Sequence, residues 1–163
     1  MEKEVMPTNF LEFCRSQLAH IRPVSRHVTG EHTQADQMHP LVLAYVGDAL
    51  YELFVRLTAL GHETKVRHLH RMVTGLVKAS TQAGILKNIE HQLTEEEQTA
   101  AKRGRNAKTG HTPKNATVVD YRLATGFEAL LGYLFFTGND DRLTEILNLA
   151  VSEGERIIKS SDK

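Results

Sequence analysis

The sequence has little of several features that specialised proteins depend on. Its 163 residues include one cysteine, four prolines and no tryptophan. A single cysteine, Cys14, excludes an intrachain disulfide and any site built from several thiolates, and it fits a reducing compartment. The longest apolar stretches, 41–46 and 129–136, are far shorter than the ~18–20 residues of a membrane span. We therefore expect a soluble, cytoplasmic protein with no membrane association.

Net charge is also absent, because 20 Lys and Arg residues balance 20 Asp and Glu residues. This balance excludes a uniformly basic nucleic-acid binder, but the charges are segregated along the chain. Acidic residues cluster over 90–97, and the following segment 101–117 contains five Lys and Arg residues and no acid. A chain of this length buries roughly 70% of its unfolded surface on folding, which is enough for one domain with a hydrophobic core.

Apolar residues recur at helical spacing through most of the chain, and no segment alternates convincingly like a strand. Pro40 opens a helix that is apolar nearly all round and ends near Gly61. Further helices are expected around 67–78 and 85–89, after a Thr94–Glu97 capping box, from an Asp120 cap to Gly138, and over 143–158. The pattern predicts an all-α protein, with an N-terminal extension (1–36), a folded domain (37–158) and a polar tail (159–163).

Two acidic residues stand out because they lie within the most apolar of these helices. Asp48 belongs to the helix that follows Pro40, and Glu128 to the helix expected after Asp120. A buried carboxylate needs a cation or hydrogen-bond donors to offset its lost hydration. Two carboxylates on separate helices suit Mg²⁺, which is commonly held by one or two carboxylates together with waters and substrate phosphate. Helix capping or pairing with Arg56 or Arg122 is the other interpretation, and spacing alone favours it.

Two other candidate groups have ordinary interpretations. Glu52, one turn after Asp48, either joins such a site or forms an i,i+4 ion pair with Arg56, and we favour the ion pair. His68 and His70 point apart on a helix and do not indicate a transition-metal site.

The segment 101–117 reads AKRGRNAKTGHTPKNAT. Gly104, Gly110 and Pro113 interrupt regular structure, so we expect a cationic loop whose charges and backbone amides suit phosphate. A merely solvated charged segment is equally consistent with the composition. A second, weaker basic stripe consists of Lys65, Arg67, Arg71 and Lys78.

Three motifs resemble those of one enzyme family. LAYVGDALYE (43–52) resembles the signature helix of the ribonuclease III family, FEALLGY (127–133) resembles its other catalytic helix, and 70–72 is similar to the helix between them. The segments KRGRNAK, PKN and FEALLGYLF are similar to the sequences of Mini-ribonuclease III, the compact bacterial branch of the family that lacks a double-stranded RNA-binding domain. The resemblance covers roughly residues 37–155.

This resemblance implies a ribonuclease III endonuclease-domain-like helical bundle that acts as a homodimer and cleaves double-stranded RNA with Mg²⁺, leaving 5′-phosphate and 3′-hydroxyl ends. The implied substrate is the stem formed by the ends of precursor 23S ribosomal RNA, and a ribosomal protein or pre-ribosomal particle is a further candidate partner. Asp48 and Glu128 match the family's catalytic, metal-binding acids, with Glu52 as a possible accessory residue. The candidate RNA-binding residues are Lys102, Arg103, Arg105, Asn106, Lys108, Lys114 and Asn115.

Two positions depart from the family's pattern. Larger members carry a glutamate where this chain has Ala44, and an aspartate where it has Thr125. The expected site is therefore poor in carboxylates, which weakens the case for two metal ions held by four acids. A non-catalytic double-stranded RNA-binding or ribosome-assembly module on the same fold is the alternative function. A helical interaction protein with a solvated basic segment is a third.

Overall fold

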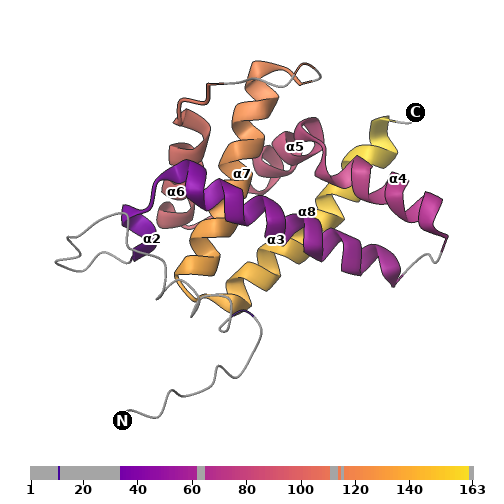
Figure 1. Cartoon of the computed structure of the whole chain (residues 1–163), viewed down its shortest axis with the longest axis horizontal. Coiled ribbons are helices and arrows are strands. Elements are labelled where there is room, and N and C mark those ends of the chain that lie inside the picture. The colour runs from indigo at the N-terminus through magenta and orange to yellow at the C-terminus, as the bar shows by residue number, and fades with distance from the viewer. Residues whose placement is uncertain (1–10, 12–33, 62–64, 111–113, 115, 162–163) are drawn as a thin grey trace, which may run out of the picture.

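The computed structural model describes Leu11 and residues 34–61, 65–110, 114 and 116–161, so most of the expected N-terminal extension lies outside the described residues. Every element in this part of the chain is a helix, which confirms the all-α class (Figure 1). In chain order the elements are α2 (Gln34–Gln37), α3 (Pro40–Leu60), α4 (Val66–Val77), α5 (Ala79–Ile89), the short 3₁₀ helix η2 (Glu90–Gln92), α6 (Glu95–Asn106), α7 (Val118–Phe136) and α8 (Asp140–Ser161).

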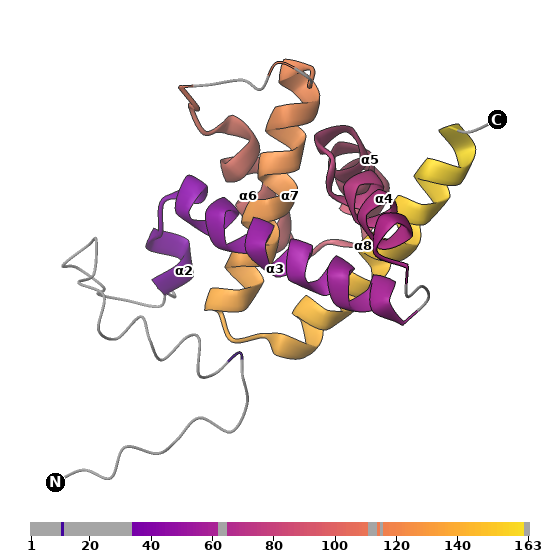
Figure 2. The same ribbon diagram turned by 45° about the vertical axis from the view of Figure 1, so that its right-hand side comes forward.

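Helix α7 lies at the centre of the bundle and packs against α2, α3, α5, α6 and α8 (Figure 2). It occupies the centre because it is apolar on nearly every face: between Ala124 and Phe135, Glu128 is the only charged residue. The helix begins where the side chain of Thr117 accepts a hydrogen bond from the backbone N–H of Asp120. The prediction that Asp120 is the cap was wrong, since Thr117 fills that position.

Helix α3 lies across α7 (Figures 1 and 2). Pro40 is its first residue and Gly61 follows its last, which confirms both predicted ends. The side chain of His39 caps the start by accepting a backbone N–H of the first turn at 3.2 Å. On the buried face, the rings of Tyr51 and Phe127 meet edge to face with centroids 5.0 Å apart.

Two glycines bring the backbones of α3 and α7 into contact. A Cβ atom at Gly47 would lie 1.8 Å from the carbonyl oxygen of Glu128, and one at Gly132 would lie 2.0 Å from that of Leu43. No side chain fits in either space, so only glycine permits the observed approach. This crossing brings the middle of α3, where Asp48 lies, to the part of α7 that carries Glu128.

Helix α6 corrects the expected extent of the cationic loop. The predicted capping box is present, since Thr94 accepts the N–H of Glu97 and the Glu97 carboxylate accepts the N–H of Thr94. The helix then continues to Asn106, so the first part of segment 101–117 is helical. Gly104 does not interrupt the helix. This residue is buried against α7, where a Cβ atom would lie 2.8 Å from a backbone oxygen. Gly104 is therefore a packing residue.

Helix α8 covers α5 and also contacts α4 and α7. Arg142 in its first turn donates two hydrogen bonds to the buried Glu97 carboxylate, at 2.8 and 2.9 Å, and another to the carbonyl oxygen of Gln92. This bidentate pair ties the start of α8 to the start of α6. Within the described ranges, no helix combines the length and apolarity that a membrane crossing requires.

Candidate active site

Asp48 lies in the middle of α3, one residue after the glycine that contacts α7, and its side chain is half-buried. Burial raises the pKa of this carboxyl group above its usual range. The negative charge of Glu52 raises the pKa further, and the positive charge of Arg56 lowers it. The backbone contact thus holds an acidic side chain where it is only partly hydrated.

Glu128 lies on the facing side of the crossing, in the most buried helix of the bundle. Burial raises the pKa of this carboxyl group to about 8, and the negative charge of Asp48 contributes to the increase. A side-chain hydrogen bond from Gln82 acts in the opposite direction on the same pKa. The influence of Asp48 on Glu128 means that the structure brings together the two acids that the sequence singled out.

Neither acid has the arginine partner that spacing alone suggested. Arg56 forms its ion pair with Glu52 instead, which confirms the favoured interpretation of Glu52, and Arg122 is exposed. Among the described residues, no Lys or Arg forms an ion pair with Asp48 or Glu128. The two neighbouring carboxylates therefore repel each other, and although the charge of Arg56 lowers the pKa of Asp48, no described cation pairs directly with either of them.

A hard divalent cation fits this donor set, because two carboxylates supply oxygen ligands and the cation removes their mutual repulsion. The described residues contain no group of three or more His, Cys, Asp or Glu side chains that would enclose a metal ion by themselves. Mg²⁺ does not need such a group, since waters and substrate phosphate commonly complete its coordination. Glu52 raises the pKa of both acids, so its charge acts on the site although it pairs with Arg56.

The two positions that depart from the family's pattern add no acid to the site. Ala44 is buried one turn before Asp48. Thr125 is also buried, and its hydroxyl donates a hydrogen bond of 3.0 Å to the carbonyl oxygen of Tyr121 on the same helix. Its side chain thus has a partner within α7.

Gln82 of α5, which is only 2% exposed, is a site residue that the sequence does not reveal. Its side-chain nitrogen donates a hydrogen bond of 2.9 Å to the carbonyl oxygen of Val77 at the end of α4, and its amide lies close enough to Glu128 to lower the pKa of that carboxyl group. A glutamine in a moderately apolar segment matches no motif, so the sequence pattern does not indicate that this residue belongs to a site. Only the packing of α5 against α7 reveals it.

The basic residues of segment 101–117 form a surface patch that begins on α6, here called the basic surface. Its exposed members are Lys102, Arg105, Asn106, Lys108 and Lys114. Arg103 is less exposed, and its guanidinium donates a hydrogen bond of 2.7 Å to the carbonyl oxygen of Met38 just before α3. Asn115 lies outside the described residues.

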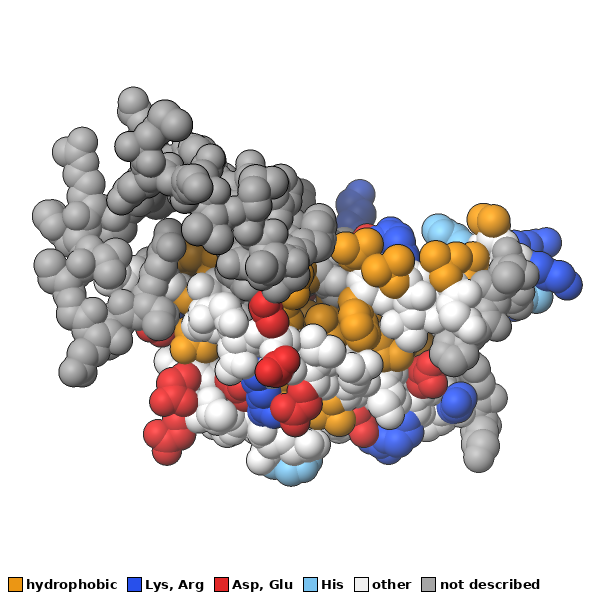
Figure 3. All heavy atoms as spheres, turned by 90° about the horizontal axis from the view of Figure 1, so that it is seen from below, with side chains coloured by type: hydrophobic (Ala, Val, Ile, Leu, Met, Phe, Trp, Pro, Cys, Tyr) orange, Lys and Arg blue, Asp and Glu red, His pale blue; other side chains and the backbone are white. Residues whose placement is uncertain are grey.

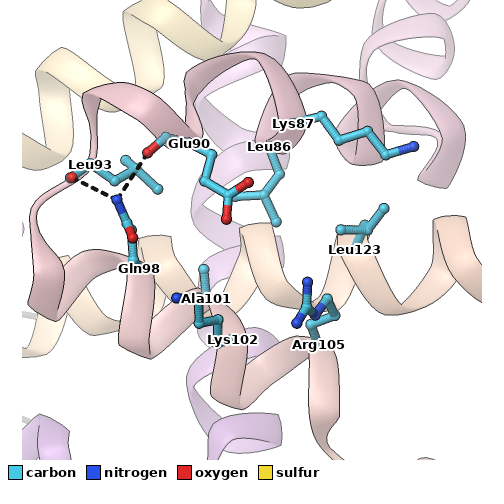
Figure 4. Close-up of a pocket in the computed structure, with 9 residues that line it drawn as sticks. All are labelled: Leu86, Lys87, Glu90, Leu93, Gln98, Ala101, Lys102, Arg105 and Leu123. Carbon is cyan, nitrogen blue, oxygen red and sulfur yellow. Dashed lines mark hydrogen bonds between the residues drawn. The ribbon is translucent and has the colours of Figure 1, made fainter.

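Two hollows adjoin the basic surface. An open one lies where the start of α3 meets α6 and is lined by Pro40, Thr99, Lys102, Arg103, Asn106 and Ala107. Asp48 is eight residues along α3 from Pro40, or about 12 Å at the rise of an α-helix. Figure 4 shows the other hollow, where Lys87 and Glu90 come from the α5 side and Lys102 and Arg105 from α6. It holds about 20 Å³, which suits one water molecule.

Comparisons with known proteins agree with these features. The family model described as the ribonuclease III domain matches residues 41–139, which include both acids. The chain is 45% identical to "Mini-ribonuclease 3" of Clostridium tetani over 126 residues, covering 75% of this chain and 83% of the relative. It is 52% identical to "Mini-ribonuclease 3" of Desulfitobacterium hafniense over 109 residues, covering 66% and 68%. The crystal structure of protein FN1578 from Fusobacterium nucleatum superimposes with a TM-score of 0.66 at 30% identity, covering 74% of this chain and 98% of that one.

Proposed function

The chain belongs to the ribonuclease III family, in its Mini-ribonuclease 3 branch, and we propose that it matures the ends of precursor 23S ribosomal RNA by Mg²⁺-dependent cleavage of a double-stranded stem. Family membership supports endonucleolytic cleavage of double-stranded RNA. The observation that carries the metal-dependent mechanism is the crossing of α3 and α7, which brings Asp48 and Glu128 together without a direct ion pair to an arginine or lysine among the described residues.

Asp48 and Glu128 would hold the Mg²⁺ ion. When bound, the ion would supply the Lewis acidity that activates an attacking water and the positive charge that offsets charge on the phosphate oxygens. The protein fixes the two carboxylates on helices whose backbones touch, so that neither needs to reorganise during the reaction. Because the pKa of Glu128 is about 8 in the absence of a cation, this residue carries a proton at neutral pH that must leave when it becomes a ligand.

The basic surface would contact the RNA backbone. Its exposed lysines and arginine suit phosphate oxygens, and the open hollow continues from α6 to the first turn of α3, the helix that carries Asp48. A-form RNA is recognised largely through its shape, phosphates and 2′-hydroxyls. We therefore expect cleavage that selects a structured stem rather than a base sequence. The cytoplasm is the compartment consistent with a ribosomal RNA substrate.

The functional unit would be a homodimer formed through α3. This helix carries exposed apolar side chains at intervals of three, four or eight residues, which place them on one face: Val42 (42% exposed), Tyr45 (83%), Leu53 (44%), Leu57 (59%) and Leu60 (58%). Figure 3 shows hydrophobic side chains gathered along the upper edge of the molecule, with Lys and Arg side chains at one end. Tyr45 lies one turn from Asp48, so pairing of two such faces would bring the two active sites near the dimer interface.

The dimer has its own test. Light scattering coupled to gel filtration should give twice the monomer mass for the wild-type protein and the monomer mass for Leu57→Glu. Val118→Glu is a matched control, because Val118 is similarly exposed on another helix. A monomeric wild-type protein, or dimers of both variants, would contradict an interface on this face of α3.

The function is tested with purified protein and an RNA stem made from the paired ends of precursor 23S ribosomal RNA. We expect discrete products with 5′-phosphate and 3′-hydroxyl ends in Mg²⁺, and binding without cleavage in EDTA. A stem with the same pairing but exchanged base pairs should be cut at similar rates. Binding without any cleavage in Mg²⁺ would contradict the proposal and would support a non-catalytic ribosome-assembly role. The same assay with pre-ribosomal particles would test whether a ribosomal protein assists.

A further inference from the structure

Gln82 is unusual among the buried polar side chains. Its oxygen Oε1 is the one buried side-chain nitrogen or oxygen atom in the described part of the chain that has no hydrogen-bond partner. The side chain is 2% exposed, so bulk water does not reach it. Buried polar atoms in folded proteins are nearly always paired, and an unpaired one requires an explanation.

The orientation of the amide group follows from its neighbours. The carbonyl oxygen of Val77 accepts hydrogen bonds, and so does the Glu128 carboxylate once it has lost the proton that it carries in the metal-free protein at neutral pH. Only the NH₂ group of Gln82 donates, and its nitrogen faces the carbonyl oxygen of Val77, while the amide as a whole lies beside Glu128. Turning the amide over would place its oxygen against Val77 and lose the 2.9 Å hydrogen bond. The hydrogen bond to Val77 therefore fixes the amide with its oxygen unpaired.

A role in packing alone does not account for this arrangement. The junction between α4 and α5 is already fastened by the neighbouring residue, because Thr81 donates a hydrogen bond of 2.8 Å to the carbonyl oxygen of Gly75. An apolar side chain of similar volume at position 82 would fill the same space without burying an unpaired oxygen. What such a side chain would lack is an amide donor beside Glu128.

We propose that Gln82 is a positioning residue of the active site, which orients the Glu128 carboxylate toward the divalent cation and offers its unpaired oxygen to a water molecule of that cation's hydration shell. Residues that hydrogen-bond to metal ligands commonly fix the orientation of the ligand in this way. Mg²⁺ keeps several waters when it binds to proteins, and these waters are donors, which the unpaired oxygen requires. Gln82 thus contributes to a site that has few carboxylates. This inference rests on the proposed function.

The test compares Gln82→Met, which keeps the length of the side chain and removes its amide, with Thr81→Val, which removes a hydrogen bond at the same junction but does not contact Glu128. Binding of Mn²⁺ to the full-length protein is measured by titration calorimetry without RNA. The Mg²⁺ concentration that half-saturates cleavage is measured separately from the maximal rate. Thermal unfolding in EDTA reports the structural effect of each substitution.

We expect Gln82→Met to weaken Mn²⁺ binding about 10-fold to 100-fold and to raise the half-saturating Mg²⁺ concentration in parallel. Thr81→Val should lower the unfolding temperature and leave both metal measurements unchanged. If Gln82→Met does not fold, Gln82→Asn, which withdraws the amide by one methylene group, should show the same weakened binding. Wild-type Mn²⁺ affinity in the folded Gln82 variant, or equal weakening of Mn²⁺ binding by Thr81→Val, would overturn the role of Gln82 and leave the proposed function standing. Failure of the wild-type protein to bind Mn²⁺ would overturn the proposed metal-dependent function as well.

Discussion

Replacing Gly47 with alanine should separate the two helices that carry the active-site acids. The new Cβ atom would lie 1.8 Å from the carbonyl oxygen of Glu128 and 2.7 Å from its carbonyl carbon, whereas ordinary contacts begin near 3.4 Å. The obstacle is backbone, which no rotamer change removes, so α3 and α7 must move apart by about 1.6 Å at this point. Overpacking a core typically costs about 1–3 kcal/mol and occasionally more, and we expect the upper end.

The better helix propensity of alanine offsets about 1 kcal/mol of this cost. Urea unfolding should therefore show a net loss of about 2 kcal/mol or more for Gly47→Ala. A displacement of about 1 Å at catalytic groups costs roughly 100-fold in rate, so single-turnover cleavage by the folded fraction should fall at least that far. Gly110→Ala is the control for stability, since its Cβ would meet nothing within 4 Å. Wild-type stability and cleavage in Gly47→Ala would refute the described contact between α3 and α7.

Three further predictions test the charges of the structure. Burial raises the pKa of Glu128 from 4.5 to about 8, so the metal-free wild-type protein should lose stability as the pH rises between these values. Glu128→Gln should remove this pH dependence and raise the free energy of unfolding at pH 7, measured by chemical denaturation, by up to about 3 kcal/mol. The same substitution should abolish cleavage. The hydrogen bonds from Arg142 lower the pKa of Glu97, so this pair should contribute stability above pH about 4.5 that is lost as the pH falls through the lowered pKa. Glu97→Gln should lower the free energy of unfolding at pH 7 by about 3 kcal/mol and reduce its dependence on pH in the acid range. Neutralising Lys102 and Arg105 should weaken duplex binding in EDTA and reduce the log–log salt slope by roughly 0.7–0.9 for each lost phosphate contact, whereas an unchanged slope would place the RNA elsewhere.

The sequence predicted the helices whose ends carry strong local signals. Pro40 and Gly61 mark the ends of α3, and the Thr94–Glu97 capping box marks the start of α6, because each signal depends on backbone geometry within a few residues. Asp48 and Glu128 were recognisable because a charge in an apolar helix needs an explanation, and the family resemblance then gave their role. Their proximity depended on a crossing that no local pattern encodes.

The errors arose where tertiary packing outweighs local preference. Gly104 resembled a helix breaker, but α6 continues through it because α7 leaves no room for a larger side chain. Thr117 and Asp120 are both good cap residues, and only the backbone geometry distinguishes them. Gln82 carries no signal at all in its own segment, because its significance depends on Glu128, 46 positions away in the sequence. Contacts of this kind become visible only in three dimensions.

The most direct test of the account is single-turnover cleavage of a long uniform RNA duplex in Mg²⁺ by Asp48→Asn and Glu52→Gln. Both substitutions nearly preserve side-chain shape and remove one negative charge from the same face of α3. The account predicts that Asp48→Asn binds the duplex in EDTA like the wild-type protein but does not cleave it in Mg²⁺. Glu52→Gln, which loses its ion pair with Arg56 and its repulsion of the two acids but leaves both proposed metal ligands in place, retains cleavage. Cleavage at the wild-type rate by Asp48→Asn would contradict the central claim that the crossing of α3 and α7 forms the active site.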